Sequence, residues 1–174
     1  MNLKNSYFLA QDCLSNCGQA LFNIRKHLGY SRQQTADLSR LHVNTIGHIE
    51  RGSKDVNIIT QTRLFAAFGC TAVKIVPGNI SLDCDFNSME QIRSQLLSIP
   101  NPQIISLIGS AIRKIRSELG CSIKEIAKKA NIHPNSLWNI ENGLVICSFL
   151  TLYRIYSSLG VSRIYLSNTG ITLE

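Results

Sequence analysis

The sequence predicts an all-α protein built from two copies of one small helical domain, each followed by a short β-strand. Three observations support this fold class. The chain matches itself at a constant offset of 91 residues, helical segments alternate with glycine breakers in both halves, and each half ends in a short β-type run. A chain of 174 residues is long enough for two small domains.

The internal repeat aligns residues 18–82 with residues 109–173 without a gap. Its glycines, apolar positions and capping positions recur in register. Identical pairs include Gly18/Gly109, Ala20/Ala111, Arg25/Arg116, Leu28/Leu119, Gly29/Gly120, Ser31/Ser122, Ala36/Ala127, His42/His133, Asn44/Asn135, Ile49/Ile140, Glu50/Glu141, Gly52/Gly143, Thr60/Thr151, Arg63/Arg154 and Gly69/Gly160. Duplication of one fold is the direct explanation of this pattern.

Each copy is predicted to contain five helices separated by breakers. In the first copy they span 11–28, 32–39, 43–51, 57–61 and 62–68. In the second copy they span 102–119, 123–130, 134–142, 148–152 and 153–159. Ser31 is placed to cap its helix, and Pro134 suits a first helical turn, where the missing N–H is not needed.

Two β-type runs follow the helical sets, at 73–76 and 164–167, and each is bounded by turn-forming residues at 77–79 and 168–170. Because a lone short strand is unstable in water, we expect the two runs to pair with each other. The pairing would make a covalent pseudo-dimer with approximate two-fold symmetry. The expected domains are 1–82 and 102–174, joined by a linker at 83–101 that contains an amphipathic helix.

The charge is distributed as two basic blocks around an acidic centre. Residues 1–82 carry nine Lys/Arg against four Asp/Glu, residues 83–108 one against three, and residues 109–174 eight against four, for a net charge of +7. Basic surfaces favour polyanions, nucleic acid above all. No apolar run approaches the roughly 18–20 residues that cross a membrane, and no secretory signal is recognisable, so a cytoplasmic protein is expected. The six cysteines lack metal-ligand spacing, and neither metal nor cofactor is predicted.

The segments YSRQQTADLSRLHVNTIGHIERG, at 30–52, and CSIKEIAKKANIHPNSLWNIENG, at 121–143, resemble the helix-turn-helix of the Cro/C1-type (Xre) family, whose general pattern is LSQEELAEKAGVSRSTISRIENG. The resemblance extends over 18–70 and 109–161. It implies a lambda-repressor-like five-helix domain in each copy and sequence-specific binding to double-stranded DNA.

In this family the third helix, here 43–51 and 134–142, enters the major groove, and the start of the second helix faces the phosphate backbone. Asparagine suits a bidentate contact with adenine, and arginine suits guanine or phosphate. The DNA-binding residues that the resemblance implies are Arg32, Gln33, His42, Val43, Asn44, Gly47, His48, Arg51, Lys124, His133, Pro134, Asn135, Trp138, Asn139 and Asn142.

Four of these positions differ from the family's usual pattern, and three of them leave alternatives open. Gly47 leaves a gap where a side chain usually reaches DNA. Trp138 suits contact with a thymine methyl group, or packing against the linker helix or a partner. His42 and His133 replace the usual capping serine, and they suit weak capping, a phosphate contact or a plain surface position.

The turn before the third helix differs between the copies. Arg40 stands in place of the family's glycine, and Asn131 does so in the second copy. Asparagine adopts the left-handed conformation more readily than arginine. The first turn is therefore expected to be distorted, or to carry a phosphate-contacting arginine at some conformational cost.

The resemblance also implies two structural ion pairs, Arg25–Glu50 and Arg116–Glu141, between the first and third helices of each copy. These pairs are expected to support the fold and not to contact DNA directly. Removal of one partner from such a partly buried pair costs a few kcal/mol.

The expected function is a transcriptional repressor that recognises two non-identical half-sites. The alternative is an antitoxin-like or adaptor protein that binds a toxin-like or effector protein, because strand exchange between helix-turn-helix units resembles HipB-like antitoxins. Further homodimerisation stays open. An enzyme has little support, since only Cys13, Cys17 and His27 are candidates for a catalytic site.

Overall fold

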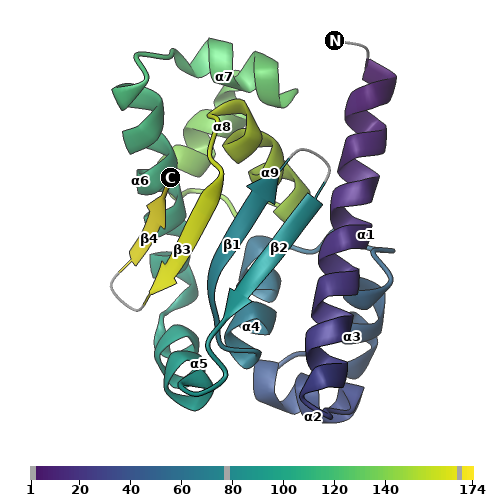
Figure 1. The fold of residues 1–174 in the computed structure, drawn as a ribbon. Coiled ribbons are helices and arrows are strands. Elements are labelled where there is room, and N and C mark those ends of the chain that lie inside the picture. Colours follow the sequence, from purple (N-terminus) through teal and green to yellow (C-terminus); the bar gives the residue numbers. More distant parts are fainter. Residues whose placement is uncertain (1–2, 77–78, 168–169) are drawn as a thin grey trace.

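The computed structural model describes the backbone of residues 3–76, 79–167 and 170–174. The elements form two similar sets, in each of which helices are followed by two strands (Figure 1). Within the described residues the elements are α1 Leu3–His27, α2 Arg32–Ser39, α3 Val43–Glu50, α4 Ile58–Ala67, β1 Cys70–Val76, β2 Asn79–Cys84, α5 Met89–Ser98, α6 Asn101–Glu118, α7 Ile123–Ala130, α8 Pro134–Glu141, α9 Phe149–Ser158, β3 Arg163–Ser167 and β4 Gly170–Leu173.

The prediction of five helices per copy is wrong, because the last two predicted helices form one continuous helix in both copies. The segments 57–61 and 62–68 form the single helix α4, and 148–152 and 153–159 form α9. Asn57 and Ser148 cap these helices by accepting the backbone N–H groups of Thr60 and Thr151. No glycine or proline follows until the helix ends, so nothing in the sequence interrupts either helix.

The strands form one antiparallel sheet in the order β2-β1-β3-β4 within the described residues (Figure 1). The predicted runs lie in β1 and β3 and pair with each other, with Val73 opposite Ile164, which confirms the expected pairing. Each run belongs to a hairpin, so the predicted all-α class is corrected to a mainly helical fold with a small sheet. Residues 77–78 and 168–169 of the predicted turns lie outside the described residues.

Backbone hydrogen bonds also join the two copies at the N-terminal ends of α4 and α9. Phe149 donates its N–H to the Val56 carbonyl at 2.8 Å, and Ile58 donates to the Cys147 carbonyl at 3.1 Å. These are equivalent positions of the repeat, since 56 and 58 become 147 and 149 at the 91-residue offset. Each copy therefore donates to the other the equivalent of the hydrogen bond that it accepts.

The buried apolar residues form one cluster that draws on both copies. Phe65 of α4 meets Phe149 of α9 edge to face, with 6.2 Å between ring centroids. The cluster continues into Val73 and Ile164 of the central strands. The two copies are thus packed on a shared core. No helix in the described range is long and apolar enough to span a membrane.

Candidate nucleic-acid interface

Each predicted recognition helix is held against the first helix of its copy by a close crossing at glycine. A Cβ added to Gly18 of α1 would lie 2.3 Å from the Ile49 carbonyl oxygen of α3. A Cβ added to Gly109 of α6 would lie 2.3 Å from the Ile140 oxygen of α8. Only glycine permits this approach, which explains why both copies carry it.

Both expected ion pairs are present and bidentate. Arg25 binds both carboxylate oxygens of Glu50 and donates to the Tyr30 carbonyl at 2.8 Å. Arg116 donates to the two oxygens of Glu141 at 2.6 and 2.8 Å. Each arginine therefore ties the recognition helix to the first helix, in the geometry that gives the strongest arginine–carboxylate pairs.

Arg32, an expected phosphate contact, also binds Glu50, with 2.8 Å between Nε and Oε2. Burial alone would raise the pKa of Glu50, but hydrogen bonds and charge from Arg25 and Arg32 outweigh it, so the pKa lies below its ordinary value. The Arg32 side chain is still 44% exposed. In the second copy Ile123 replaces Arg32, and Arg113 of α6 instead lies near the carboxylate, with 3.9 Å between its Nε and Oε2 of Glu141.

The turns before α3 and α8 have the same backbone. Arg40 has φ 55° and ψ 41°, and Asn131 has φ 54° and ψ 51°. The expected distortion of the first turn is therefore wrong: arginine adopts the left-handed conformation that asparagine adopts in the second copy. This conformation is unfavourable for a residue with a Cβ.

Replacement of Arg40 by glycine is expected to raise the free energy of unfolding by about 1 kcal/mol, because it relieves the left-handed strain. Thermal unfolding followed by circular dichroism would show a higher Tm. Asn131→Gly is the matched control, and its gain should be smaller because asparagine tolerates this region. A lower Tm for Arg40→Gly would mean that side-chain contacts of Arg40 outweigh the backbone strain.

His42 and His133 cap the recognition helices. The Nδ1 atom of His42 accepts the backbone N–H of Asn44 at 3.2 Å, and His133 accepts that of Asn135 at the same distance. A neutral ring that accepts at Nδ1 carries its proton on Nε2. Because both histidines are exposed, each offers an Nε2–H donor of the kind that binds phosphate oxygens.

The outer face of α3 presents Asn44, His48 and Arg51 to solvent, with Val43 half-buried. Gly47 is buried, and a Cβ at this position would lie 3.2 Å from a guanidinium nitrogen of Arg51, so the long side chain of Arg51 folds back over the glycine. The expected absence of a DNA-contacting side chain at Gly47 stays a prediction.

The outer face of α8 differs in chemistry. Asn135 is exposed, and Trp138 is 47% exposed, which does not support its packing against the linker helix. The Asn142 amide is already engaged: it accepts from Arg113 at 2.6 Å and donates to the Trp138 carbonyl at 2.7 Å. Pro134 and Asn139 of the expected set are half-buried.

Sequence reasoning missed an apolar loop that follows α8. Leu144, Val145 and Ile146 are 63%, 40% and 51% exposed. The equivalent segment of the first copy is Ser53-Lys54-Asp55, which is polar. Position-by-position comparison of the copies at the repeat offset was the signal that could have found this difference.

The remaining expected phosphate contacts lie at the starts of α2 and α7. Gln33 and Lys124 are both exposed. The Gln33 amide donates to Asp37 at 2.9 Å, so its orientation is fixed within α2. The structure thus places these side chains on the surface at the helix starts, as the family pattern requires.

The candidate catalytic residues lack a reactive arrangement. Cys13 and Cys17 are buried in the core, and burial raises the pKa of both thiols, that of Cys13 to about 12. A thiolate is therefore disfavoured at both positions. His27 stacks near Phe86, with 5.6 Å between ring centroids.

Two family models match the chain, one for each copy. A model described as helix-turn-helix matches residues 21–75, and a model described as a helix-turn-helix domain matches residues 109–169. The matched segments include the whole of α2–α3 and of α7–α8, together with their ion pairs. No curated protein and no solved structure gives a significant match to the chain.

Proposed function

Since the chain belongs to the Cro/C1-type helix-turn-helix regulators and carries two such domains in tandem, we propose that it is a repressor that binds an operator with two unlike half-sites. The observation that carries this proposal is the contrast between a conserved frame and divergent outer faces. The glycine crossing, the ion pair and the histidine cap recur in both copies. Of the side chains that face outward, Asn44 and Asn135 also recur, but Gly47, His48 and Arg51 are replaced by Trp138, Asn139 and Asn142.

A pseudo-dimer with an approximate two-fold axis explains how both helices would meet one DNA molecule. Val73 pairs with Ile164, and Asn57 with Ser148, and in each pair the partner is the residue's own equivalent at the 91-residue offset. A residue that meets its own equivalent is the mark of a two-fold contact. The α2–α3 and α7–α8 units lie on opposite sides of the sheet's centre in Figure 1.

This arrangement supports half-sites about one DNA turn apart, roughly 34 Å, as in two-fold helix-turn-helix dimers. Residues 1–82 and 102–174 would each supply one reading unit, joined by 83–101. Repression would be steric, because a protein that covers adjacent major grooves on a promoter excludes the polymerase. The net charge of +7 would favour the approach to DNA.

Selection of bound sequences from a random duplex library tests the proposal. We expect an asymmetric consensus, with one half changed by Asn44→Ala and the other by Asn135→Ala, each at a cost of about 1–3 kcal/mol at its own position. Asn23→Ala, which removes an exposed asparagine of α1, is the control and should leave the consensus unchanged. A palindromic consensus, or a loss of affinity that is uniform across sequences, would contradict the two-half-site proposal.

A protein-binding role is the second candidate, and one observation favours it. Trp138 and the apolar loop Leu144–Ile146 give the second copy an exposed apolar surface where the first copy is polar. Such surfaces are common at protein interfaces. Trp138→Asn discriminates: it should alter recognition of one half-site if α8 contacts DNA, and should leave DNA binding unchanged if this face binds a protein.

A further inference from the structure

Two cysteines of the first copy lie in contact at the open end of the β1–β2 hairpin. Cys70 begins β1 and Cys84 ends β2, and they stand opposite each other in the antiparallel register. Their Sγ atoms are 3.0 Å apart, and both side chains are free thiols. A small side-chain rotation would bring the sulfurs to the roughly 2.05 Å of a disulfide bond.

A β-bulge creates this contact. Further along the hairpin, β1 and β2 pair Ala72 with Asp83. An unbroken ladder from that pair would put Thr71, not Cys70, opposite Cys84. Since successive strand residues point to opposite faces of a sheet, Cys70 would then point away from Cys84. The register shift between Cys70 and Ala72 adds one residue to β1 and brings the two sulfur atoms to the same side.

The backbone at this position suits a bridge. The Asp85 N–H donates to the Gly69 carbonyl at 3.0 Å, one residue beyond the cysteines on both strands. The cysteines therefore occupy a non-hydrogen-bonded position of the ladder, where opposite Cα atoms lie about 4.5 Å apart. Disulfides span Cα separations of roughly 4.4–6.8 Å, so the bridge fits without backbone movement.

The two thiols differ in exposure. Cys70 is fully buried, whereas Cys84 is half-buried and reaches solvent. Because burial disfavours a charged sulfur, Cys70 keeps its proton and donates the hydrogen bond. This hydrogen bond, together with burial, raises the pKa of Cys70, and the same hydrogen bond lowers the pKa of Cys84. The thiolate that reacts with an oxidant therefore forms at Cys84.

We propose that Cys70 and Cys84 are a redox modification site, at which a peroxide forms a reversible disulfide bond. The Cys84 thiolate attacks one peroxide oxygen, the O–O bond breaks, and the departing hydroxide takes up the proton that Cys84 released, giving a sulfenic acid and water. The Cys70 thiol then loses its proton and attacks the Cys84 sulfur, and the hydroxyl group leaves with that proton as a second water. Two electrons pass from the sulfurs to the peroxide. One hydrogen peroxide and two thiols thus give one disulfide and two waters.

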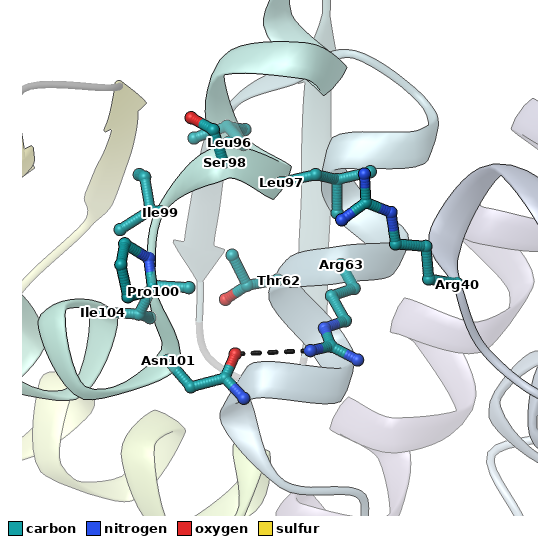
Figure 2. A pocket seen from close by; sticks show the side chains of 10 residues that line it. All are labelled: Arg40, Thr62, Arg63, Leu96, Leu97, Ser98, Ile99, Pro100, Asn101 and Ile104. Carbon is teal, nitrogen blue, oxygen red and sulfur yellow. Dashed lines mark hydrogen bonds between the residues drawn. The ribbon is translucent and has the colours of Figure 1, made fainter.

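The bridge would lie where the hairpin meets the linker helix α5. Asp85 follows Cys84 directly, and its carboxylate accepts the backbone N–H of Ser88, just before α5, at 3.2 Å. At its other end α5 borders a cavity of about 280 Å³ beside Arg40 (Figure 2). The disulfide would therefore fix the end of the hairpin from which α5 starts. The site goes beyond DNA binding, because neither cysteine belongs to the expected DNA-binding set.

Peroxide treatment of the reduced full chain tests the proposal. Two of the six thiols should be lost, because burial raises the pKa of the other core thiols and protects them. Trypsin cuts after Lys74, inside the 70–84 loop, so the disulfide should join peptides 64–74 and 75–93 in non-reducing mass spectrometry. Dithiothreitol should separate these peptides and restore all six thiols. Six thiols after peroxide treatment, or a different pair of linked peptides, overturns the proposal.

Three variants locate the pair. Cys70→Val introduces the residue that the second copy carries at the equivalent position, Val161, so the fold is expected to persist. This variant and Cys84→Ser should give no linked peptides. Cys121→Ser removes a half-buried cysteine of the second copy and should still lose two thiols. Loss of two thiols in Cys70→Val, or of none in Cys121→Ser, would contradict the assignment.

Thermal unfolding provides an independent readout. The oxidised chain should have a higher Tm than the reduced chain, because a bridge between residues 70 and 84 restricts the unfolded state. Cys84→Ser should have the same Tm before and after peroxide treatment. A lower Tm for the oxidised wild type would contradict the fit of the bridge to the hairpin.

Discussion

Replacement of Glu50 by alanine is expected to lower the free energy of unfolding by about 3–5 kcal/mol, because it leaves a buried guanidinium without its partner. Arg25 is 4% exposed and Glu50 is 7% exposed, so water cannot solvate the orphaned charge without local opening. This loss is large beside a typical stability of about 5–15 kcal/mol. Urea unfolding followed by circular dichroism measures it.

The double variant Arg25→Met/Glu50→Leu distinguishes the free-energy cost of an unpaired buried charge from the cost of losing the ion pair. It removes both charges and is expected to recover most of the stability that Glu50→Ala loses. Glu141→Ala is the matched change in the second copy, where the Arg116 side chain is 13% exposed and the penalty should be smaller. A cost below about 1 kcal/mol for Glu50→Ala would mean that Arg25 is effectively solvated.

The same network sets an acid limit on stability. The pKa of Glu50 is lowered in the folded protein, so its contribution is fully present above the unfolded value of about 4.3. That contribution is lost as the pH falls through the lower folded value, because the unfolded chain binds the proton first. The wild type should therefore lose stability on acidification below about pH 4.3, and Arg25→Met/Glu50→Leu should lack this part of the loss.

Replacement of Gly18 by alanine is expected to cost about 1–3 kcal/mol, or more, by overpacking the crossing of α1 and α3. The new Cβ would lie 2.3 Å from the Ile49 oxygen and 2.8 Å from the Glu50 oxygen. Both are backbone atoms, so no side-chain rotation relieves the clash, and α3 must shift. Stability should fall in urea, and binding should weaken at the half-site that α3 is proposed to read.

Gly29→Ala is the control for the change in conformational freedom. Gly29 has φ +69° and no atom within 4 Å of a new Cβ, so this change should cost about 1–2 kcal/mol through backbone strain alone. It should leave the position of α3, and hence DNA recognition, unchanged. Gly109→Ala repeats the clash in the second copy and should weaken the other half-site. Equal effects of Gly18→Ala and Gly29→Ala on DNA affinity would contradict the role of the crossing.

The repeat explains why so much of the frame was predictable. The capping positions and helix-ending glycines are visible in one sequence because a second copy in the same chain repeats them, whereas the ion pairs were implied by the resemblance to the helix-turn-helix family. The second strand of each hairpin was missed although the signal exists: Ile80 and Leu82 alternate with Ser81 and Asp83, the period-two pattern of a strand. The run is short, and its pairing with β1 is what makes it stable.

Other features were not predictable because they depend on long side chains and on elements distant in sequence. The side chain of Arg51 covers Gly47. This side chain is flexible, and the sequence does not specify its direction. The cavity at Arg40 requires the turn, α4, α5 and the start of α6 together. The apolar loop after α8 was missed for a different reason. Its apolar residues could be read from the sequence, but their exposure to solvent could not.

The pairing of β1 with β3 inside one polypeptide has a quantitative consequence for gene control. Separate subunits must first find each other, so at low abundance the occupied fraction of their target rises with the square of protein concentration. A single chain that carries both halves replaces this encounter with a fixed, high effective concentration. The occupancy of its target would rise with the first power of protein concentration, which is a graded response. Because the two halves are covalently joined, dilution would not separate them.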